Sequence, residues 1–329
     1  MRVFILYTFL MVMQDRLTLH NFLTLSGSDS GIGHALAKHL DSLGFVVFAG
    51  VLDKDGPGAQ ELRQSCSPRL CVLQLDITST TQGSGDISIH ALCFLLSPGL
   101  WGLVNNAGIL GFPADGELLP MSTYRHCMEV NFFGAVQVSK TFLPLLRKSR
   151  GRLVNMSSMA GGIPLPRYAA YGASKAALSM FSGVMRQELS KWGIKVAAIH
   201  PSGFRTAEQW DEQEQELLAS LAAETRSAYG EEYLLGLRSY LVQLPSHCAP
   251  DLSPVLAAVL HALLATRPHG LYTPGKGAYI PLFIFCCFPL WFYDFFISKV
   301  LGAGSAPGQP RMAGGENQNP RCSPWCPTP

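Results

Sequence analysis

The sequence has few charged residues and no marked excess of either sign. Only 15% of its 329 residues are charged, and the formal net charge is +2 at pH 7. It lacks the dense Lys/Arg cluster with which proteins neutralise phosphate groups, so we expect no nucleic-acid partner. Apolar residues reach 48%, a high share for a freely soluble protein that leaves room for contact with a membrane.

The nine cysteines lack the spacings of metal sites. None of them forms a CxxC pair, and no combination of cysteine and histidine has a zinc-finger spacing. We therefore expect free thiols and no metal.

The sequence also lacks an apolar run of the about 20 residues that a membrane-spanning helix needs. The opening MRVFILYTFLMVM is shorter, and residues 278–293 are apolar but contain two prolines. We expect residues 1–20 to be an anchor remnant or a signal-like segment, and residues 278–301 to associate with a membrane through their aromatic side chains. A buried core helix or a subunit contact is the alternative for 278–301. The Gly/Pro-rich tail, 302–329, is expected to be disordered.

Between residues 21 and 277, apolar strand-like runs alternate with amphipathic stretches. The runs are FLTL, FVVFAGVL, LCVLQLDI, LWGLVNNAG, GRLVNMSS and IKVAAIHPSG. Such runs indicate strands buried on both faces, so we predict an α/β fold with a Rossmann-type doubly wound parallel sheet in a single domain. Residues 80–98 fit the expected crossover helix poorly. From about residue 204, and most clearly over 209–240, a charged amphipathic stretch predicts a helical substrate lid.

The stretch SGSDSGIG, residues 26–33, follows the first predicted strand and opens a helix. Gly27, Gly31 and Gly33 allow a tight turn that brings a diphosphate against the helix N-terminus, and Ser30 and Ile32 belong to the same turn. A turn that only connects the strand to the helix, without a ligand, explains a glycine-rich stretch about as well. The position of this one after the first strand favours a nucleotide.

Two further strand ends carry candidate cofactor contacts. The NNAG stretch supplies Asn105, Ala107 and Gly108, and LQLDIT supplies Asp76 and Ile77. Ligands of parallel sheets bind at the carboxyl ends of the strands. Asp76 is either an acceptor for an adenine amine or a helix N-cap.

Tyr171 and Lys175 lie four residues apart in YGASK, and Ser158 precedes them by thirteen residues at a strand end. Residues at i and i+4 share one face of a helix. A nearby ammonium favours the tyrosinate form and lowers the pKa of the phenol, which suits Tyr171 to acid–base chemistry. Ser158 is placed to donate to the same substrate oxygen.

In this order, the glycine turn, NNAG, an asparagine, a serine and YxxxK resemble the short-chain dehydrogenase/reductase family over residues 23–279. The resemblance implies hydride transfer with a nicotinamide cofactor. It implies that Tyr171 is the acid/base, that Ser158 orients the substrate oxygen, and that Lys175 holds the ribose. Asn131 would anchor a water in the proton relay, and Thr206 would contact the nicotinamide carboxamide.

Longer stretches, among them NAGILGFPADGELLPM and YTPGKGAY, resemble the hydroxysteroid dehydrogenases of this family. This likeness implies oxidation of a steroid 17β-alcohol such as estradiol or testosterone, with NAD, at the endoplasmic reticulum membrane. A homodimer is a further expectation. The alternatives are a retinol or 11β-hydroxysteroid dehydrogenase, and a non-catalytic member that binds cofactor or steroid.

Two positions depart from the family pattern. Members that prefer NAD often carry an acid at the end of the second strand, where this chain has Val51. Asp53, two residues on, points to the same side of a continuing strand and either takes that role or is a plain turn residue. No Arg or Lys stands nearby to receive a 2′-phosphate, so we predict NAD. After Pro201, a second expected cofactor contact, Ser202 replaces the usual glycine; a glycine-only backbone here would cost about 1 kcal/mol or more.

Overall fold

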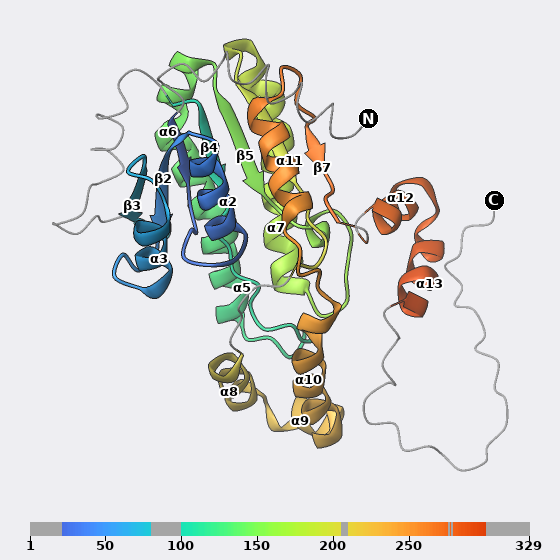
Figure 1. Cartoon of the computed structure of the whole chain (residues 1–329). Helices are drawn as coiled ribbons and strands as arrows, with labels where there is room; N and C mark the ends of the chain where they lie inside the picture. Colours follow the sequence, from blue (N-terminus) through green and yellow to red (C-terminus); the bar gives the residue numbers. More distant parts are fainter. Residues whose placement is uncertain (1–21, 80–99, 205–209, 276, 278, 301–329) are drawn as a thin grey trace, which may run out of the picture.

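The computed structural model describes residues 22–79, 100–204, 210–275, 277 and 279–300, and everything below concerns these residues. Its centre is a parallel sheet of order β3-β2-β1-β4-β5-β6-β7 (Figure 1). The strands are β1 (Phe22–Leu25), β2 (Val46–Val51), β3 (Leu70–Gln74), β4 (Gly102–Asn105), β5 (Arg152–Met156), β6 (Lys195–Ile199) and β7 (Leu271–Tyr272).

The central strands are buried on both faces, which explains their continuous apolar sequences. Every residue of β4 and β5 is buried, because helices cover the sheet from either side and leave no polar face. The predicted doubly wound sheet is therefore confirmed. The two-residue edge strand β7 was not predicted, since so short a pairing leaves no periodic pattern.

Two helical layers sandwich the sheet. One apolar core joins the sheet to α2, α3 and α11, and a second lies against α6 and the end of α7. Helices α2 and α11 are seen on the same side of the sheet in Figure 1. The bounds are α2 (Gly31–Ser42), α3 (Pro57–Ser65), α5 (Met121–Met128), α6 (Ala135–Ser149), α7 (Ala169–Glu188) and α11 (Ser253–Leu264).

Three helices project beyond one end of the sheet: α8 (Asp211–Ser220), α9 (Ala223–Tyr229) and α10 (Glu231–Gln243) (Figure 1). They lie in the stretch whose amphipathic pattern predicted helices. A small apolar core joins α8 and α10 to the 109–119 loop, through Leu217 and Leu237 on the helices and Phe112 and Leu118 on the loop. This segment therefore packs against the main domain.

The expected membrane-associating segment contains α12 (Tyr279–Cys287) and α13 (Leu290–Val300). Their inner side chains Tyr293 and Ile297 pack on Ile163, whereas much of their remaining apolar surface is exposed. None of the helices in the described ranges is long and apolar enough to cross a membrane. The expectations for residues 1–20, 80–98 and 302–329, and the one for Thr206, fall outside the described residues.

Candidate active site

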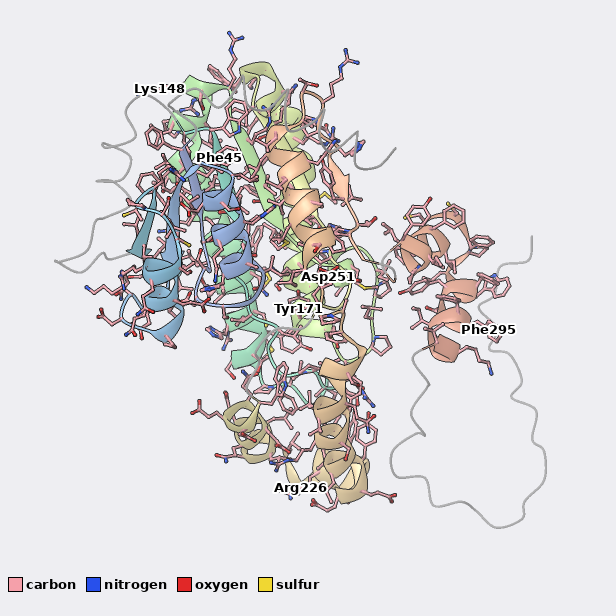
Figure 2. All side chains as sticks on the ribbon, viewed as in Figure 1. Phe45, Lys148, Tyr171, Arg226, Asp251 and Phe295 are labelled. Atoms are coloured by element: carbon pink, nitrogen blue, oxygen red, sulfur yellow. The ribbon has the colours of Figure 1, made fainter. Side chains whose placement is uncertain are left out.

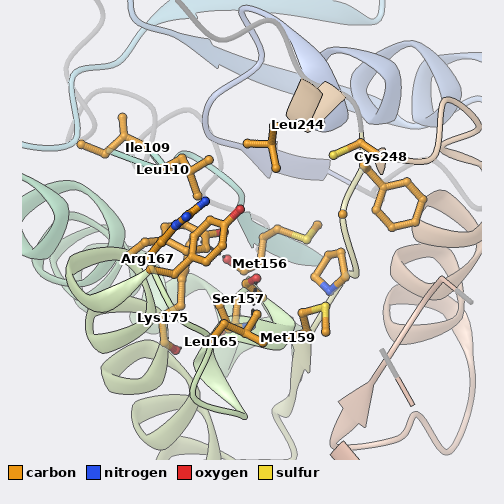
Figure 3. A pocket seen from close by; sticks show the side chains of 18 of the residues that line it. Ile109, Leu110, Met156, Ser157, Met159, Leu165, Arg167, Lys175, Leu244 and Cys248 are labelled. Atoms are coloured by element: carbon orange, nitrogen blue, oxygen red, sulfur yellow. Dashed lines mark hydrogen bonds between the residues drawn. The ribbon is translucent and has the colours of Figure 1, made fainter. Parts of the chain in front are cut away.

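A cavity of about 1650 Å³ opens at the carboxyl edge of the sheet, between the ends of β1, β4 and β5 and the helices α9, α10 and α13. Figure 2 shows Tyr171 between the sheet and α8–α10, and Figure 3 shows part of the lining from close by. Many of the predicted site residues line this cavity: Gly27, Ser30, Gly31, Ile32, Asp76, Ile77, Ala107, Gly108, Ser158, Tyr171, Lys175 and Pro201.

The glycine turn lies in direct contact with the end of β4. Gly27 has a φ of +67°, and a Cβ there would come within 2.6 Å of the Ala107 Cα. A Cβ on Gly33 would come within 2.0 Å of the Gly27 carbonyl oxygen. Only glycine fits at these two places, because the backbone conformation and the close approach each exclude a side chain.

Two residues that the sequence reading did not place in the site lock this turn. The Ser26 hydroxyl accepts hydrogen bonds from the backbone N–H groups of Asn106 and Ala107, at 3.1 Å each. The Asn106 amide donates to the carbonyls of Ser26 and Gly27 at 3.2 and 3.0 Å. The Ser26 hydroxyl thus ties the glycine turn to the end of β4, and Asn106 is the asparagine of NNAG that lines the cavity.

The N-terminus of α2 fits a dinucleotide diphosphate. Ser30 occupies the N-cap position without a side-chain capping hydrogen bond, and the first turn carries no acidic residue. The first N–H groups of a helix lack intrahelical partners and attract anions. Ser30, Gly31 and Ile32 all line the cavity, so these donors face the space that the cofactor needs.

Ser158, Tyr171 and Lys175 converge on the opposite wall. Ser158 ends the segment after β5 and is the N-cap of a short 3₁₀ helix, where its hydroxyl accepts from the Ala160 N–H at 3.2 Å. Tyr171 and Lys175 lie on α7, and the Lys175 Nζ is 5.8 Å from the centroid of the Tyr171 ring. The predicted i, i+4 placement is what brings the ammonium beside the phenol.

Lys175 is almost wholly buried, with 3% of its surface exposed. Its Nζ donates to the Met156 carbonyl at the end of β5, at 2.9 Å. Burial lowers the pKa of Lys175 to about 8, because an ammonium loses solvation there. Lys175 is still mostly protonated at neutral pH, so it provides a positive charge beside Tyr171.

Asn131 lies behind the cavity rather than in its lining. Its amide exchanges hydrogen bonds with the backbone of Ile109, at 2.8 Å in each direction, and donates to the Ser174 hydroxyl at 2.9 Å. It belongs to a π-helical turn, Glu129–Gly134, between α5 and α6, a feature common at functional sites. Its role in a water relay stays a prediction.

The side chains of Asn131 and Lys175 both pack against the backbone of Gly108. A Cβ on Gly108 would lie 2.9 Å from the Asn131 Oδ1 and 2.9 Å from the Lys175 Nζ. Such contacts are shorter than real Cβ atoms show, so the last residue of NNAG is a glycine because two polar side chains pack against its backbone.

Asn105 was predicted to contact the cofactor, and the structure places it elsewhere. It is 3% exposed and donates to the Ser139 hydroxyl and the Asn155 Oδ1, at 2.8 Å each. Asn105 is the last residue of β4, so strand alternation turns its side chain toward α6. Asn105 therefore links β4 to β5 and α6. The two-residue period of the strand is the signal that places the side chains of Asn105 and Asn106 on opposite sides.

Asp53, the expected ribose acid, does not line the cavity. It is exposed, and its carboxylate accepts from the N–H of Asp55 in its own turn at 2.9 Å, as the plain-turn reading expects. Asp29 of the glycine turn lines the cavity instead, and its carboxylate accepts from the N–H groups of Leu52 and Asp53 just after β2, at 2.9–3.2 Å. An acid from the first loop therefore stands where the second strand lacks one.

The remaining predicted contacts have simple local structures. Asp76 accepts from the N–H and hydroxyl of Thr78, at 2.9 and 2.7 Å, so it caps its own turn while lining the cavity. Ser202 is not among the residues with positive φ, and the feared backbone strain is absent. The Ser202 side chain lies against Gly275 (φ +104°), where a Cβ would come within 2.0 Å of the Ser202 hydroxyl.

The comparisons with known proteins agree with this geometry. The profile of the short chain dehydrogenase family matches residues 22–217, and the chain belongs to this family. The human 17-beta-hydroxysteroid dehydrogenase type 2 is 52% identical over 304 residues, which cover 91% of this chain and 78% of that protein. The bovine 11-beta-hydroxysteroid dehydrogenase type 2 is 46% identical over 318 residues, with 91% and 78% covered.

Solved structures share the fold at lower identity. A short-chain dehydrogenase from Streptomyces avermitilis superposes with a TM-score of 0.62 at 21% identity, covering 86% of this chain and 93% of that one. Family membership confirms the predictions of an oxidoreductase and of its family.

Proposed function

We propose that this enzyme oxidises the 17β-hydroxyl group of a steroid to a ketone with NAD. The observation that carries the proposal is the convergence of Ser158, Tyr171 and Lys175 with the glycine turn on one largely apolar cavity of about 1650 Å³. This volume exceeds that of an ordinary single-ligand pocket, about 300–1,000 Å³, and suits a dinucleotide together with a steroid. The similarity to hydroxysteroid dehydrogenases supports the substrate class.

Each side chain has a defined task in this proposal. A nicotinamide dinucleotide held by the glycine turn would supply the acceptor for the hydride of the carbinol carbon. Tyr171 takes the proton of the hydroxyl group, while Ser158 donates a hydrogen bond that holds the same oxygen. Lys175, protonated beside the ring and fixed on the Met156 carbonyl, stabilises the tyrosinate that does so. Asn131 is a positioning residue that fixes the Ile109 backbone and, through Ser174, the first turn of α7.

Asp29 accounts for the choice of NAD. Its carboxylate is fixed by backbone N–H groups after β2 and lines the cavity. A fixed negative charge repels a 2′-phosphate and accepts hydrogen bonds from free ribose hydroxyls. NAD is therefore favoured over NADP without the usual acid on the second strand.

The outer surface of α12 and α13 supports a membrane setting. Trp291 is 69% exposed and Leu290 60%, with Ile280 and Phe295 at 58% each. Aromatic and aliphatic side chains of this kind favour the interface of a bilayer. We place this surface on the membrane of the endoplasmic reticulum, and flotation with phosphatidylcholine vesicles, lost in Trp291→Glu, tests the attachment.

The test of the activity is NADH formation with estradiol and with testosterone, by enzyme expressed in membranes, with the product identified as the 17-ketone. Corticosteroid 11β-alcohols and retinol are assayed in parallel. If a corticosteroid 11β-alcohol or retinol is oxidised faster, that compound and not the 17β-hydroxysteroid is the substrate. Folded enzyme that binds NADH and oxidises none of them would establish a non-catalytic member.

A further inference from the structure

One group of polar side chains in the cavity has no task in the chemistry at Tyr171. We name it the Arg167 cluster, and its members are Arg167, Asp115, Tyr168, Tyr233 and Tyr240. They come from three parts of the chain: the loop before α5, the turn into α7, and α10. The convergence of distant segments on one place of an otherwise apolar cavity is typical of a recognition site.

Arg167 adopts an unusual backbone conformation. Its φ is +72°, and among the described non-glycine residues only Arg150 shares a positive φ. The left-handed conformation costs an L-residue about 1–2 kcal/mol. Such strain persists where the surroundings over-determine it, and it gathers at ligand clamps and active sites.

The guanidinium of Arg167 contacts two tyrosines of α10, Tyr233 and Tyr240. Its Cζ is 4.4 Å from the centroid of the Tyr240 ring. Within the described residues, no carboxylate is in ion-pair contact with it. The Tyr233 hydroxyl donates to the Asp115 carboxylate and also lies within hydrogen-bonding reach of the Arg167 guanidinium. A guanidinium carries five N–H donors, so the contact with Tyr233 leaves others available to an acceptor oxygen.

The Arg167 cluster is linked to the phenol of Tyr171 through the side chains of Tyr240 and Tyr168. The Tyr240 and Tyr168 hydroxyls are 3.2 Å apart, and the Tyr168 and Tyr171 rings have centroids 6.4 Å apart. Figure 3 shows the nitrogen-bearing end of Arg167 directed into the pocket, toward Ile109 and Leu110. A rigid apolar molecule with its alcohol at Tyr171 would carry its other end toward this guanidinium.

We propose that Arg167 determines substrate specificity by donating hydrogen bonds to an acceptor oxygen at the end of the substrate remote from the reacting alcohol. The inference rests on the proposed function and narrows it: the preferred substrate is an apolar secondary alcohol with a carbonyl oxygen at its opposite end. A site built around such a donor rejects an analogue without the oxygen, because the donor is then left unpaired.

Calorimetry on the enzyme loaded with NADH tests this proposal with two matched ligands. One is a saturated 17β-hydroxysteroid with a ketone at carbon 3, and the other is the same skeleton without that oxygen. With NADH bound, the 17β-alcohol of either ligand has no hydride acceptor, so binding with this alcohol at Tyr171 is measured without turnover. We expect Arg167→Met to weaken the ketone ligand at least about tenfold, in keeping with loss of a hydrogen bond to a charged group, and to change the deoxygenated ligand less than about twofold.

Arg150→Met is the matched control, because Arg150 shares the left-handed backbone and is exposed outside the cavity. We expect it to leave both ligands unchanged. Arg167→Lys keeps the charge without the planar fork and should weaken the ketone ligand less than Arg167→Met does. Should Arg167→Met not fold, Tyr240→Leu removes the ring beneath the guanidinium and gives the same selective loss, by about threefold.

An equal loss for both ligands, or no loss for either, would make Arg167 a structural residue and overturn the proposal. Wild-type enzyme could bind the ketone ligand more tightly than the deoxygenated one, lose this preference in Arg167→Met, and still oxidise neither ligand when NAD is supplied. That result would refute the proposed function while supporting the assignment of Arg167. Wild-type enzyme that binds neither ligand would overturn both.

Discussion

The two ends of the cavity are built in different ways. At the sheet end, Asn131 and Lys175 are buried and form hydrogen bonds with the backbone of Ile109 and Met156. At the outer end, α9 has no buried residue and α8 has one, Leu217. The residues proposed for proton transfer thus lie beside the buried sheet, and the proposed substrate-facing wall rests on a small separate core. The difference indicates that damage to the sheet end should alter turnover, and damage to the outer end should alter binding.

The sharpest way to break the sheet end is Gly108→Ala. The new methyl would overlap the Asn131 Oδ1 and the Lys175 Nζ, and overpacking of this kind costs about 1–3 kcal/mol. We expect kcat to fall by about 10²-fold, since small displacements of reacting groups have effects of this size. Steady-state NADH formation measures it. Gly183→Ala in α7, with open space around it, is the control, and equal losses in both variants would contradict the assignment.

The outer end is tested by Leu237→Ala, which opens the small core beneath α10. Leu237 is 3% exposed, and removing such a side chain costs about 2–5 kcal/mol. We expect the KM for the steroid to rise by about tenfold or more with kcat within about threefold, because the wall rather than the reacting groups is loosened. The exposed Leu235 of the same helix, as Leu235→Ala, should change neither value. A fall in kcat without a rise in KM would contradict the assignment of turnover to the sheet end and of substrate binding to the outer end.

Asp29→Asn removes a charge at the sheet end while keeping an acceptor for the Leu52 N–H. We expect the ratio of kcat/KM for NAD over NADP to fall by at least about tenfold, which corresponds to about 1.4 kcal/mol. Asp53→Asn should leave the ratio unchanged, since its carboxylate bonds to its own turn. The reverse pattern would restore Asp53 as the selecting acid.

The smallest expected effect is a pH dependence of stability without cofactor. Burial lowers the pKa of Lys175 from 10.5 to about 8, so between these values the unfolded chain binds more protons than the folded one. Stability relative to Lys175→Met should therefore rise with pH above about 8, by about 1–2 kcal/mol at pH 9.5. Urea unfolding at pH 7.5 and 9.5 measures the difference. Parallel pH profiles of the two proteins would mean that Lys175 is solvated.

The sequence allowed most of the sheet end to be predicted and little of the outer end. The alternation of apolar runs predicted the parallel sheet, and Ser158, Tyr171 and Lys175 meet because YxxxK spacing matches one helical turn. Single-residue identities could not tell Asn105 from Asn106, or Asp53 from Asp29, since each pair differs in strand alternation or in loop position. Arg167 escaped notice because its strain and its ring contact depend on α10, about seventy residues away.

The measurement that tests the central claim most directly follows the hydride itself. Testosterone with deuterium on the carbon that carries the 17β-hydroxyl is incubated with NAD and the enzyme, and the nicotinamide is analysed by mass spectrometry. We predict one deuterium in the NADH for each 17-ketone formed, and no NADH above background from a Tyr171→Phe enzyme that still binds NADH. Ketone formed without deuterium in the NADH, or undiminished turnover in Tyr171→Phe, would contradict the account.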